Sequence, residues 1–210
     1  MPAPELILDG LSNIANQWWL LAAAWHAYFA VLIVGLIFGV RPSKRVAGIL
    51  LALPLLSVSA LAWLAANPFN GALLGLAGVA LIVLAFRLPD EPIQIAPLWV
   101  VVAGALMFVF GWVYPHFLDT FPLFAYLYAA PTGLVPCPTL SIVIGLAIIV
   151  GGLDSRLWTS ILAATGLFYG LFGALRLGVT IDIVLLLGAL VALVVVFLPK
   201  VHAARPAPAH

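Results

Sequence analysis

Charge is scarce in this sequence. Of its 210 residues, 66% are hydrophobic and only 7% are charged, whereas ordinary soluble domains carry about 25% charged residues. A soluble domain of this length could not bury so much apolar surface. The net charge of +1 and the lack of a large basic cluster give no reason to expect a nucleic-acid partner. We therefore expect a polytopic membrane protein whose main partner is the lipid bilayer.

Cysteine is scarcer still, because Cys137 is the only one. A single thiol excludes an internal disulfide and any zinc motif that needs paired thiols. The segment before the first hydrophobic stretch contains Glu5 and Asp9 but no Lys or Arg. It therefore lacks the basic region of a cleaved signal peptide. We expect the first hydrophobic stretch to be kept as a membrane span.

The hydrophobic stretches predict an all-α fold, a single transmembrane bundle of seven spans over residues 1–200, with a disordered tail at 201–210. An interfacial segment is expected at 5–16. Residues 120–136 contain Pro122, Pro131 and Gly133 and predict a re-entrant or interfacial hairpin. The predicted spans are 17–39, 46–66, 72–86, 96–114, 139–153, 157–175 and 179–198.

The basic residues predict the orientation of the bundle. With seven spans, only Arg176 of the 8 Lys and Arg residues lies on the opposite side from the others. Basic residues favour the cytoplasmic side of a membrane. The N-terminus is therefore expected outside and the C-terminus inside. The others, on the predicted inner side, are Arg41, Lys44, Arg45, Arg87, Arg156, Lys200 and Arg205.

The stretch Pro136-Cys137-Pro138-Thr139 interrupts the apolar sequence. Each proline lacks a backbone donor and restricts the residue before it, so we expect no regular helix to contain both. The apolar run that follows, 139–153, rises only about 22 Å as a helix, less than the bilayer core of about 30 Å. We predict a broken fifth helix on the outer side, beginning below the surface, where irregular backbone lies against protein or a wet cavity.

Several short motifs are shared with a known family. They are Ala66-Asn67-Pro68-Phe69-Asn70, Tyr114-Pro115, Gly133 to Thr139 with Gly145-Leu146, and Leu177-Gly178-Val179 followed by Asp182. In these motifs the sequence resembles an uncharacterised bacterial multi-pass membrane family, domain of unknown function 6064. The resemblance implies a bacterial inner-membrane location, with a periplasmic N-terminus and a cytoplasmic C-terminus in the predicted topology. It supplies no activity, so no residue role is carried over.

Polar side chains gather in the predicted outer half of the membrane. Such groups are costly in a bilayer and mark functional sites by default. A helix that begins at membrane depth also directs its amide-rich N-terminus at a site, as in many transporters. Our leading hypothesis is an outward-facing pocket that binds or permeates a small solute or metal ion. The candidate ligand-binding residues are Cys137, His116, His26, Thr139, Asn67 and Asp119.

A soft metal ion such as Cu(I) would suit Cys137 together with His26 and His116, because it prefers thiolate and imidazole ligands. The chain shows no local ligand spacing that supports this, and each residue has a structural alternative. A buried free cysteine can be inert, and His26 can bind a neighbouring helix through a hydrogen bond. Thr139 can cap the helix that follows it.

Two further polar pairs have structural interpretations. Asn67 and Asn70 are expected to close a turn through side chain to backbone hydrogen bonds. Arg176 and Asp182 flank the turn between the sixth and seventh spans, where we predict an ion pair. Gly166 and Gly170, and also Gly35 and Gly39, have the spacing that allows close helix packing, which we expect within the bundle.

Absent motifs argue against an enzyme. No lysine lies at mid-membrane to form a retinal Schiff base, and no phosphate loop, HExxH or Ser-His-Asp pattern occurs. A thiol-dependent enzyme built on Cys137 would need an adjacent base such as His116. The main alternative is a non-catalytic accessory subunit, held in a larger membrane complex or in a homo-oligomer.

Overall fold

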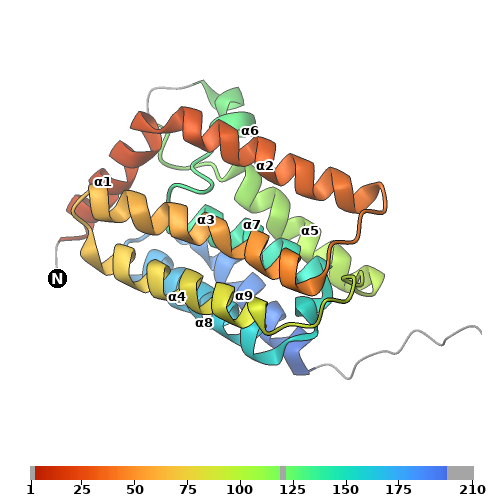
Figure 1. The fold of residues 1–210 in the computed structure, drawn as a ribbon. Helices are drawn as coiled ribbons and strands as arrows, with labels where there is room; N and C mark the ends of the chain where they lie inside the picture. Colours follow the sequence, from red (N-terminus) through yellow and green to blue (C-terminus); the bar gives the residue numbers. More distant parts are fainter. Residues whose placement is uncertain (1–2, 119–121, 198–210) are drawn as a thin grey trace, which may run out of the picture.

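The computed structural model describes residues 3–118 and 122–197. Within these residues the protein is all-helical, as the sequence predicts (Figure 1). Asp119 and the predicted tail at 201–210 lie outside the described residues. The longer helices are α1 (Pro4–Gln17), α2 (Trp19–Ile37), α3 (Lys44–Leu64), α4 (Pro68–Phe86), α5 (Leu98–Val113), α7 (Pro136–Ile149), α8 (Arg156–Leu171) and α9 (Ile183–Phe197).

Shorter helical pieces connect these elements. A single turn η1 (Leu123–Ala125) runs into α6 (Tyr126–Ala129), which lies against α2 and α5. The turn η2 (Gly151–Asp154) follows α7, and η4 (Thr180–Asp182) precedes α9. The segment η3 (Phe172–Arg176) extends α8 as a π-helix.

Five segments in the described chain are long and apolar enough to cross a membrane. They are α2, α3, α4, Arg156–Arg176 and Thr180–Phe197. Helices α5 and α7 have 16 and 14 residues, which correspond to only about 24 and 21 Å. These helices are compatible with an integral membrane protein that contacts the lipid bilayer.

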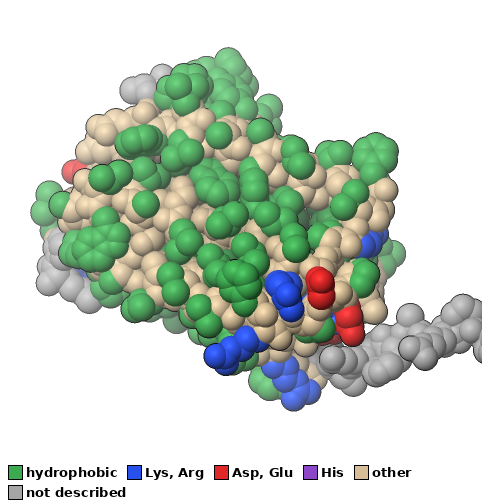
Figure 2. Space-filling model, viewed as in Figure 1, with side chains coloured by type: hydrophobic (Ala, Val, Ile, Leu, Met, Phe, Trp, Pro, Cys, Tyr) green, Lys and Arg blue, Asp and Glu red, His purple; other side chains and the backbone are tan. Residues whose placement is uncertain are grey.

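The bundle has two chemically different ends. At the first, α3 begins with Lys44 and Arg45 and α8 begins with Arg156; we call this the basic end. In Figure 2 most of the charged side chains in view gather toward one end, and hydrophobic side chains cover much of the remainder. The other end contains Tyr114 and Cys137; we call it the cysteine end. Successive long helices from α2 onward run alternately between these two ends.

Helix α7 lies at the centre of the bundle. Every residue of this helix except Cys137 is buried, and it packs against α3, α5, α8 and α9. A Cβ atom added to Gly104 of α5 would lie 2.6 Å from the carbonyl oxygen of Gly145 of α7, and the reverse distance is also 2.6 Å. Glycine at both positions therefore lets the two backbones approach closely.

One of the two predicted glycine pairs packs helices together. A Cβ atom on Gly170 would lie 2.8 Å from the backbone nitrogen of Leu186, so this glycine allows the close contact of α8 and α9. By contrast, no atom lies within 4 Å of a Cβ atom placed on Gly39. Packing within the bundle is therefore confirmed at Gly170 and absent at Gly39.

The buried side chains form two hydrophobic clusters. The larger one surrounds α7 and includes residues of α3, α4, α8 and α9. The smaller one, which we call the cap cluster, lies at the cysteine end and includes Leu11 of α1, Leu61 of α3 and Tyr114. Cys137 and Trp25 contact both clusters. Cys137 therefore lies on the boundary between the cap cluster and the main core.

At the basic end, an ion pair holds a left-handed turn. Gly151, Gly152, Leu153 and Asp154 have φ values of 60°, 63°, 57° and 55°, a conformation that costs a non-glycine residue about 1–2 kcal/mol. The Lys44 ammonium lies 2.9 Å from the Asp154 carboxylate. The turn ends α7 at Ile149, earlier than the predicted end of the fifth helix at residue 153.

Candidate functional site

Helix α7 begins at Pro136, with Val135 as its N-cap residue. Both Pro136 and Pro138 therefore lie inside its first turn. The predictions that no regular helix contains both prolines, and that the helix begins at Thr139, are wrong. The first backbone N–H groups of a helix have no intrahelical acceptor, so proline loses nothing there.

The irregular backbone before α7 is buried, and side chains satisfy it. The Gly133 N–H donates to the Thr139 hydroxyl (2.8 Å), which donates to the Val135 carbonyl (2.7 Å). The Ser57 hydroxyl donates to the Gly133 carbonyl (2.7 Å) and accepts from the Trp25 indole (3.0 Å). Thr139 thus holds the segment that enters α7 and does not face a ligand site. Of the two surroundings expected for this irregular backbone, protein or a wet cavity, these contacts are with protein, while Val135 and Pro136 also line the small cavity described below.

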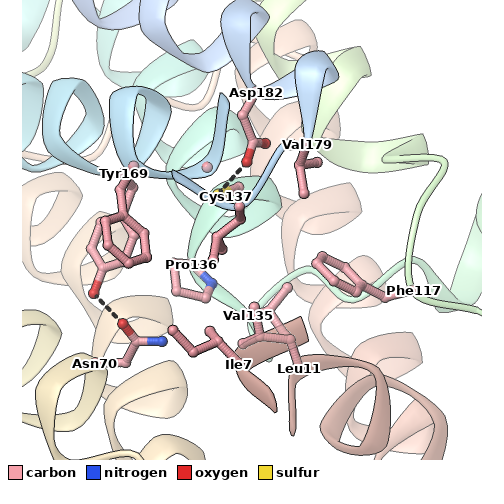
Figure 3. A pocket seen from close by; sticks show the side chains of 13 residues that line it. Ile7, Leu11, Asn70, Phe117, Val135, Pro136, Cys137, Tyr169, Val179 and Asp182 are labelled. Atoms are coloured by element: carbon pink, nitrogen blue, oxygen red, sulfur yellow. Dashed lines mark hydrogen bonds between the residues drawn. The ribbon is translucent and has the colours of Figure 1, made fainter. Parts of the chain in front are cut away.

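Cys137 faces a carboxylate across the turn between α8 and α9. Its thiol donates to Oδ2 of Asp182 at 3.1 Å (Figure 3). The Tyr114 hydroxyl donates to the other oxygen, Oδ1, at 2.6 Å. Asp182 is 1% exposed and Tyr114 is fully buried. A buried carboxylate is costly without donors, and these two hydrogen bonds supply one donor to each oxygen.

The π-helical end of α8 makes room for this carboxylate. A Cβ atom on Gly173 would overlap Oδ2 of Asp182 and would lie 2.8 Å from its Cγ. The Gly173 carbonyl accepts from the Val179 N–H at 2.9 Å, which fixes the turn around it. π-Helical segments occur often at functional sites. Here the π-helical segment places Gly173 next to the Asp182 carboxylate, where any larger side chain would overlap it.

A small cavity of about 20 Å³ lies beside the thiol. Its polar lining residues are Asn70, Cys137, Tyr169 and Asp182, and the others are apolar. The Tyr169 hydroxyl donates to Oδ1 of Asn70 at 3.1 Å (Figure 3). A volume of this size holds about one water molecule. It therefore suits a single small ion or water in this conformation.

His26 has no ring nitrogen available for a metal ion. It is 4% exposed, and its Nδ1 and Nε2 atoms lie 2.8 Å from the Ala22 carbonyl and 2.9 Å from the Trp112 carbonyl. The Trp112 carbonyl is one of the last four of α5, which lack an intrahelical donor. His26 therefore joins α2 to the end of α5, as the structural alternative for this residue predicts.

Among the described residues of the predicted set, His116 and Asn67 do not line the cavity. The His116 ring packs beside Phe117, with 4.3 Å between ring centroids. Oδ1 of Asn67 accepts from the Asn70 N–H at 3.2 Å and caps α4, which confirms the predicted turn for Asn67. In residues 3–118 and 122–197, no group of three His, Cys, Asp or Glu residues is placed to hold a metal ion. Cys137 is the only described member of the predicted set that lines the cavity.

The predicted ion pair between Arg176 and Asp182 is wrong. Asp182 uses its oxygens to accept from Tyr114 and Cys137, and Arg176 is exposed at the end of η3. Sequence reasoning also missed Tyr114, Tyr169 and Asn70 as site residues. The signal available for Tyr114 was a hydroxyl at the end of an apolar span, at the same predicted end as Asp182.

Comparisons with family models, with curated proteins and with solved structures give no match for this chain.

Proposed function

We propose that this chain is an integral protein of the bacterial inner membrane with seven spans and its cysteine end on the periplasmic side. The alternating direction of the long helices supports this arrangement, with α5 and α7 as the two short spans. The cluster of basic residues at the opposite end supports a cytoplasmic basic end, because such residues favour that side. The relationship to domain of unknown function 6064 is part of the same proposal.

We further propose that the protein binds a small solute or a soft metal ion at the Cys137–Asp182 cavity, as part of binding or permeation. The observation that carries this proposal is the buried carboxylate. Asp182 is the only buried acidic residue in the described chain, and it lies beside a thiol and an open volume. Ionisable groups within a membrane protein mark ligand or ion sites by default.

The charge of this site favours a cationic ligand. An ionised Asp182 that accepts from two neutral donors leaves one uncompensated negative charge. A thiolate at Cys137 would place a second negative charge 3.1 Å away, at a cost of about 5 kcal/mol for an effective dielectric constant of about 20. A thiol nucleophile is therefore disfavoured in the absence of a cation. A metal ion bound by both groups would offset that repulsion.

The distance between the two groups is close to what a metal ion needs. Bonds of about 2.3 Å to sulfur and about 2.1 Å to oxygen, at a tetrahedral angle, separate the two atoms by about 3.6 Å. The observed separation is 3.1 Å. An opening of about half an ångström therefore admits a small soft ion, whereas a larger solute requires the walls of the cavity to move.

The test uses Cd²⁺ as the soft metal and Cys137 as the reporter. The rate at which a maleimide alkylates Cys137 is measured in reconstituted protein over a range of Cd²⁺ concentrations. We expect Asp182→Asn to raise the Cd²⁺ concentration needed for half protection at least about tenfold, because mutation of even a hydrogen-bonding partner of a metal ligand costs about 10–100-fold in affinity. Asp90→Asn, an exposed carboxylate at the basic end, is the matched control and is expected to resemble the wild type.

Two results together would contradict the proposed function. One is equal Cd²⁺ protection in the wild type and in Asp182→Asn, which would show that the carboxylate is not a ligand. The other is a melting temperature that no tested small solute raises. Either result alone would restrict the ligand class to solutes or to metal ions, respectively.

A further inference from the structure

Helix α1 forms one wall of the cavity. Ile7 and Leu11 line it from this helix, next to Val135 and Pro136 at the start of α7 (Figure 3). Leu11 is buried, and its position four residues after Ile7 places both side chains on one helix face. The exposed residues of α1 fall on the other face at the same spacing; they include Glu5, Asp9, Asn13 and Gln17.

This wall belongs to the cap cluster, together with Phe117 and Val135 of the cavity lining, whereas Tyr169 of α8 belongs to the main core. Leu11 is part of the cap cluster, whereas the helices that surround Cys137 on its other sides contribute to the main core around α7. Moving α4, α8 or α9 would disrupt the larger cluster. Moving α1 disrupts only part of the smaller one. Because stability is not uniform across a fold, the segment with the fewest buried contacts opens first.

A joint and a hydrogen bond control the position of α1. At Trp18 the backbone leaves the helical region, with φ −108° and ψ 26°, and this residue separates α1 from α2. Two residues earlier, the Asn16 side-chain amide donates to the Phe117 carbonyl at 2.8 Å, and also to the Ser12 carbonyl at 2.8 Å. Phe117 itself lines the cavity. Asn16 therefore ties α1 to another wall of the same cavity.

We propose that α1 is the gate through which a ligand reaches the Cys137–Asp182 cavity, and that the hydrogen bond from Asn16 to Phe117 holds this gate closed. The inference rests on the proposed function only in treating the cavity as a ligand site. The route of access is a separate claim. It concerns which wall moves and which residue positions that wall.

The single cysteine makes this claim directly measurable. The rate of Cys137 alkylation by a membrane-impermeant maleimide added from the cysteine end reports access to the cavity without any introduced label. Asn16→Ala removes the amide that bonds Ser12 within α1 and Phe117 outside it. We expect the alkylation rate to rise at least about threefold to tenfold, the effect of losing the one bond to Phe117. Asn13→Ala lies on the exposed face of the same helix and is expected to leave the rate unchanged.

A second pair of variants separates a gate from general loosening. Leu11→Ala opens the α1 wall, whereas Leu61→Ala removes a comparable side chain from the cap cluster without touching the cavity lining. We expect Leu11→Ala to raise the alkylation rate more than Leu61→Ala does, at equal loss of melting temperature. This pair decides the question even if Asn16→Ala fails to fold.

Two outcomes would overturn the gate. The first is an alkylation rate for Asn16→Ala equal to that of Asn13→Ala in folded protein. The second is an equal effect of Leu11→Ala and Leu61→Ala, which would mean that access follows cluster stability and not the position of α1. Loss of Cd²⁺ protection with a preserved effect of Asn16→Ala would instead reject the proposed ligand and keep the gate.

Discussion

Replacement of Gly173 by alanine is the most direct test of the site geometry. The added Cβ atom would overlap Oδ2 of Asp182 and would lie 2.8 Å from its Cγ and 3.1 Å from its Cβ. The carboxylate cannot move aside without losing its hydrogen bonds, because Tyr114 and Cys137 hold its two oxygens. The substitution therefore forces a choice between overlap and the loss of these contacts.

The expected cost follows from three contributions. Loss of a hydrogen bond to a charged group costs about 1.5–3 kcal/mol, and overpacking of a buried position costs about 1–3 kcal/mol. Alanine regains about 1 kcal/mol relative to glycine through its helix propensity. Because the carboxylate can give way only in part, both costs apply, and Gly173→Ala should lower the free energy of unfolding by about 1.5–5 kcal/mol.

The assay is the free energy of unfolding in mixed micelles, with two reference variants. Tyr114→Phe removes the bond to Oδ1 without adding an atom, so it measures the cost of losing one of the two hydrogen bonds by itself. Gly10→Ala is the matched control, because no atom lies within 4 Å of its added Cβ, and it should be neutral or stabilising. A Gly173→Ala protein within about 0.5 kcal/mol of the wild type, the range of ordinary surface substitutions, would refute the reasoning.

Two further predictions concern other parts of the bundle. A double-mutant cycle of Lys44→Met and Asp154→Asn should give a coupling energy of about 1 kcal/mol or more that falls with added salt. The reason is that the buried Lys44 ammonium lies 2.9 Å from the Asp154 carboxylate. A coupling energy near zero would mean that this ion pair does not hold the turn. Gly133→Ala should be far more destabilising than Gly39→Ala in thermal melts, since both positions have positive φ but only Gly133 would overlap a neighbour, the indole of Trp25. Equal melting temperatures for these two variants would contradict the packing described here.

The sequence predicted the features that depend on composition and periodicity. The all-helical fold and the position of most long helices follow from the length of each apolar run. The buried, central position of α7 agrees with its lack of any polar face. The start of α7 is mispredicted because the apolar run from residue 139 looks like the start of the helix, whereas the helix begins at Pro136. Proline at the first helical position was the relevant rule.

The partner of Cys137 could not be predicted from local sequence. Asp182 lies 45 residues further along the chain, and two elements between them decide the contact. The π-helical end of α8 and the space at Gly173 set where the carboxylate points. Neither has a sequence signal distinct from that of an ordinary glycine-containing helix end. Arg176 is closer to Asp182 in the sequence than any other basic residue. Its side chain is exposed to solvent, however, whereas Asp182 is buried, and the two do not pair.

The burial of α7 also has a consequence for how the protein is made. A helix of 14 residues is apolar on every face but, at about 21 Å, it is shorter than the bilayer core of about 30 Å, so lipid alone accommodates it poorly when it leaves the ribosome. Its neighbours α8 and α9 are synthesised later, so α7 waits at the insertion machinery without the packing that these two helices supply. A nascent chain that stops before α9 should therefore be recognised by quality-control proteases, and the final hairpin is the step that completes assembly.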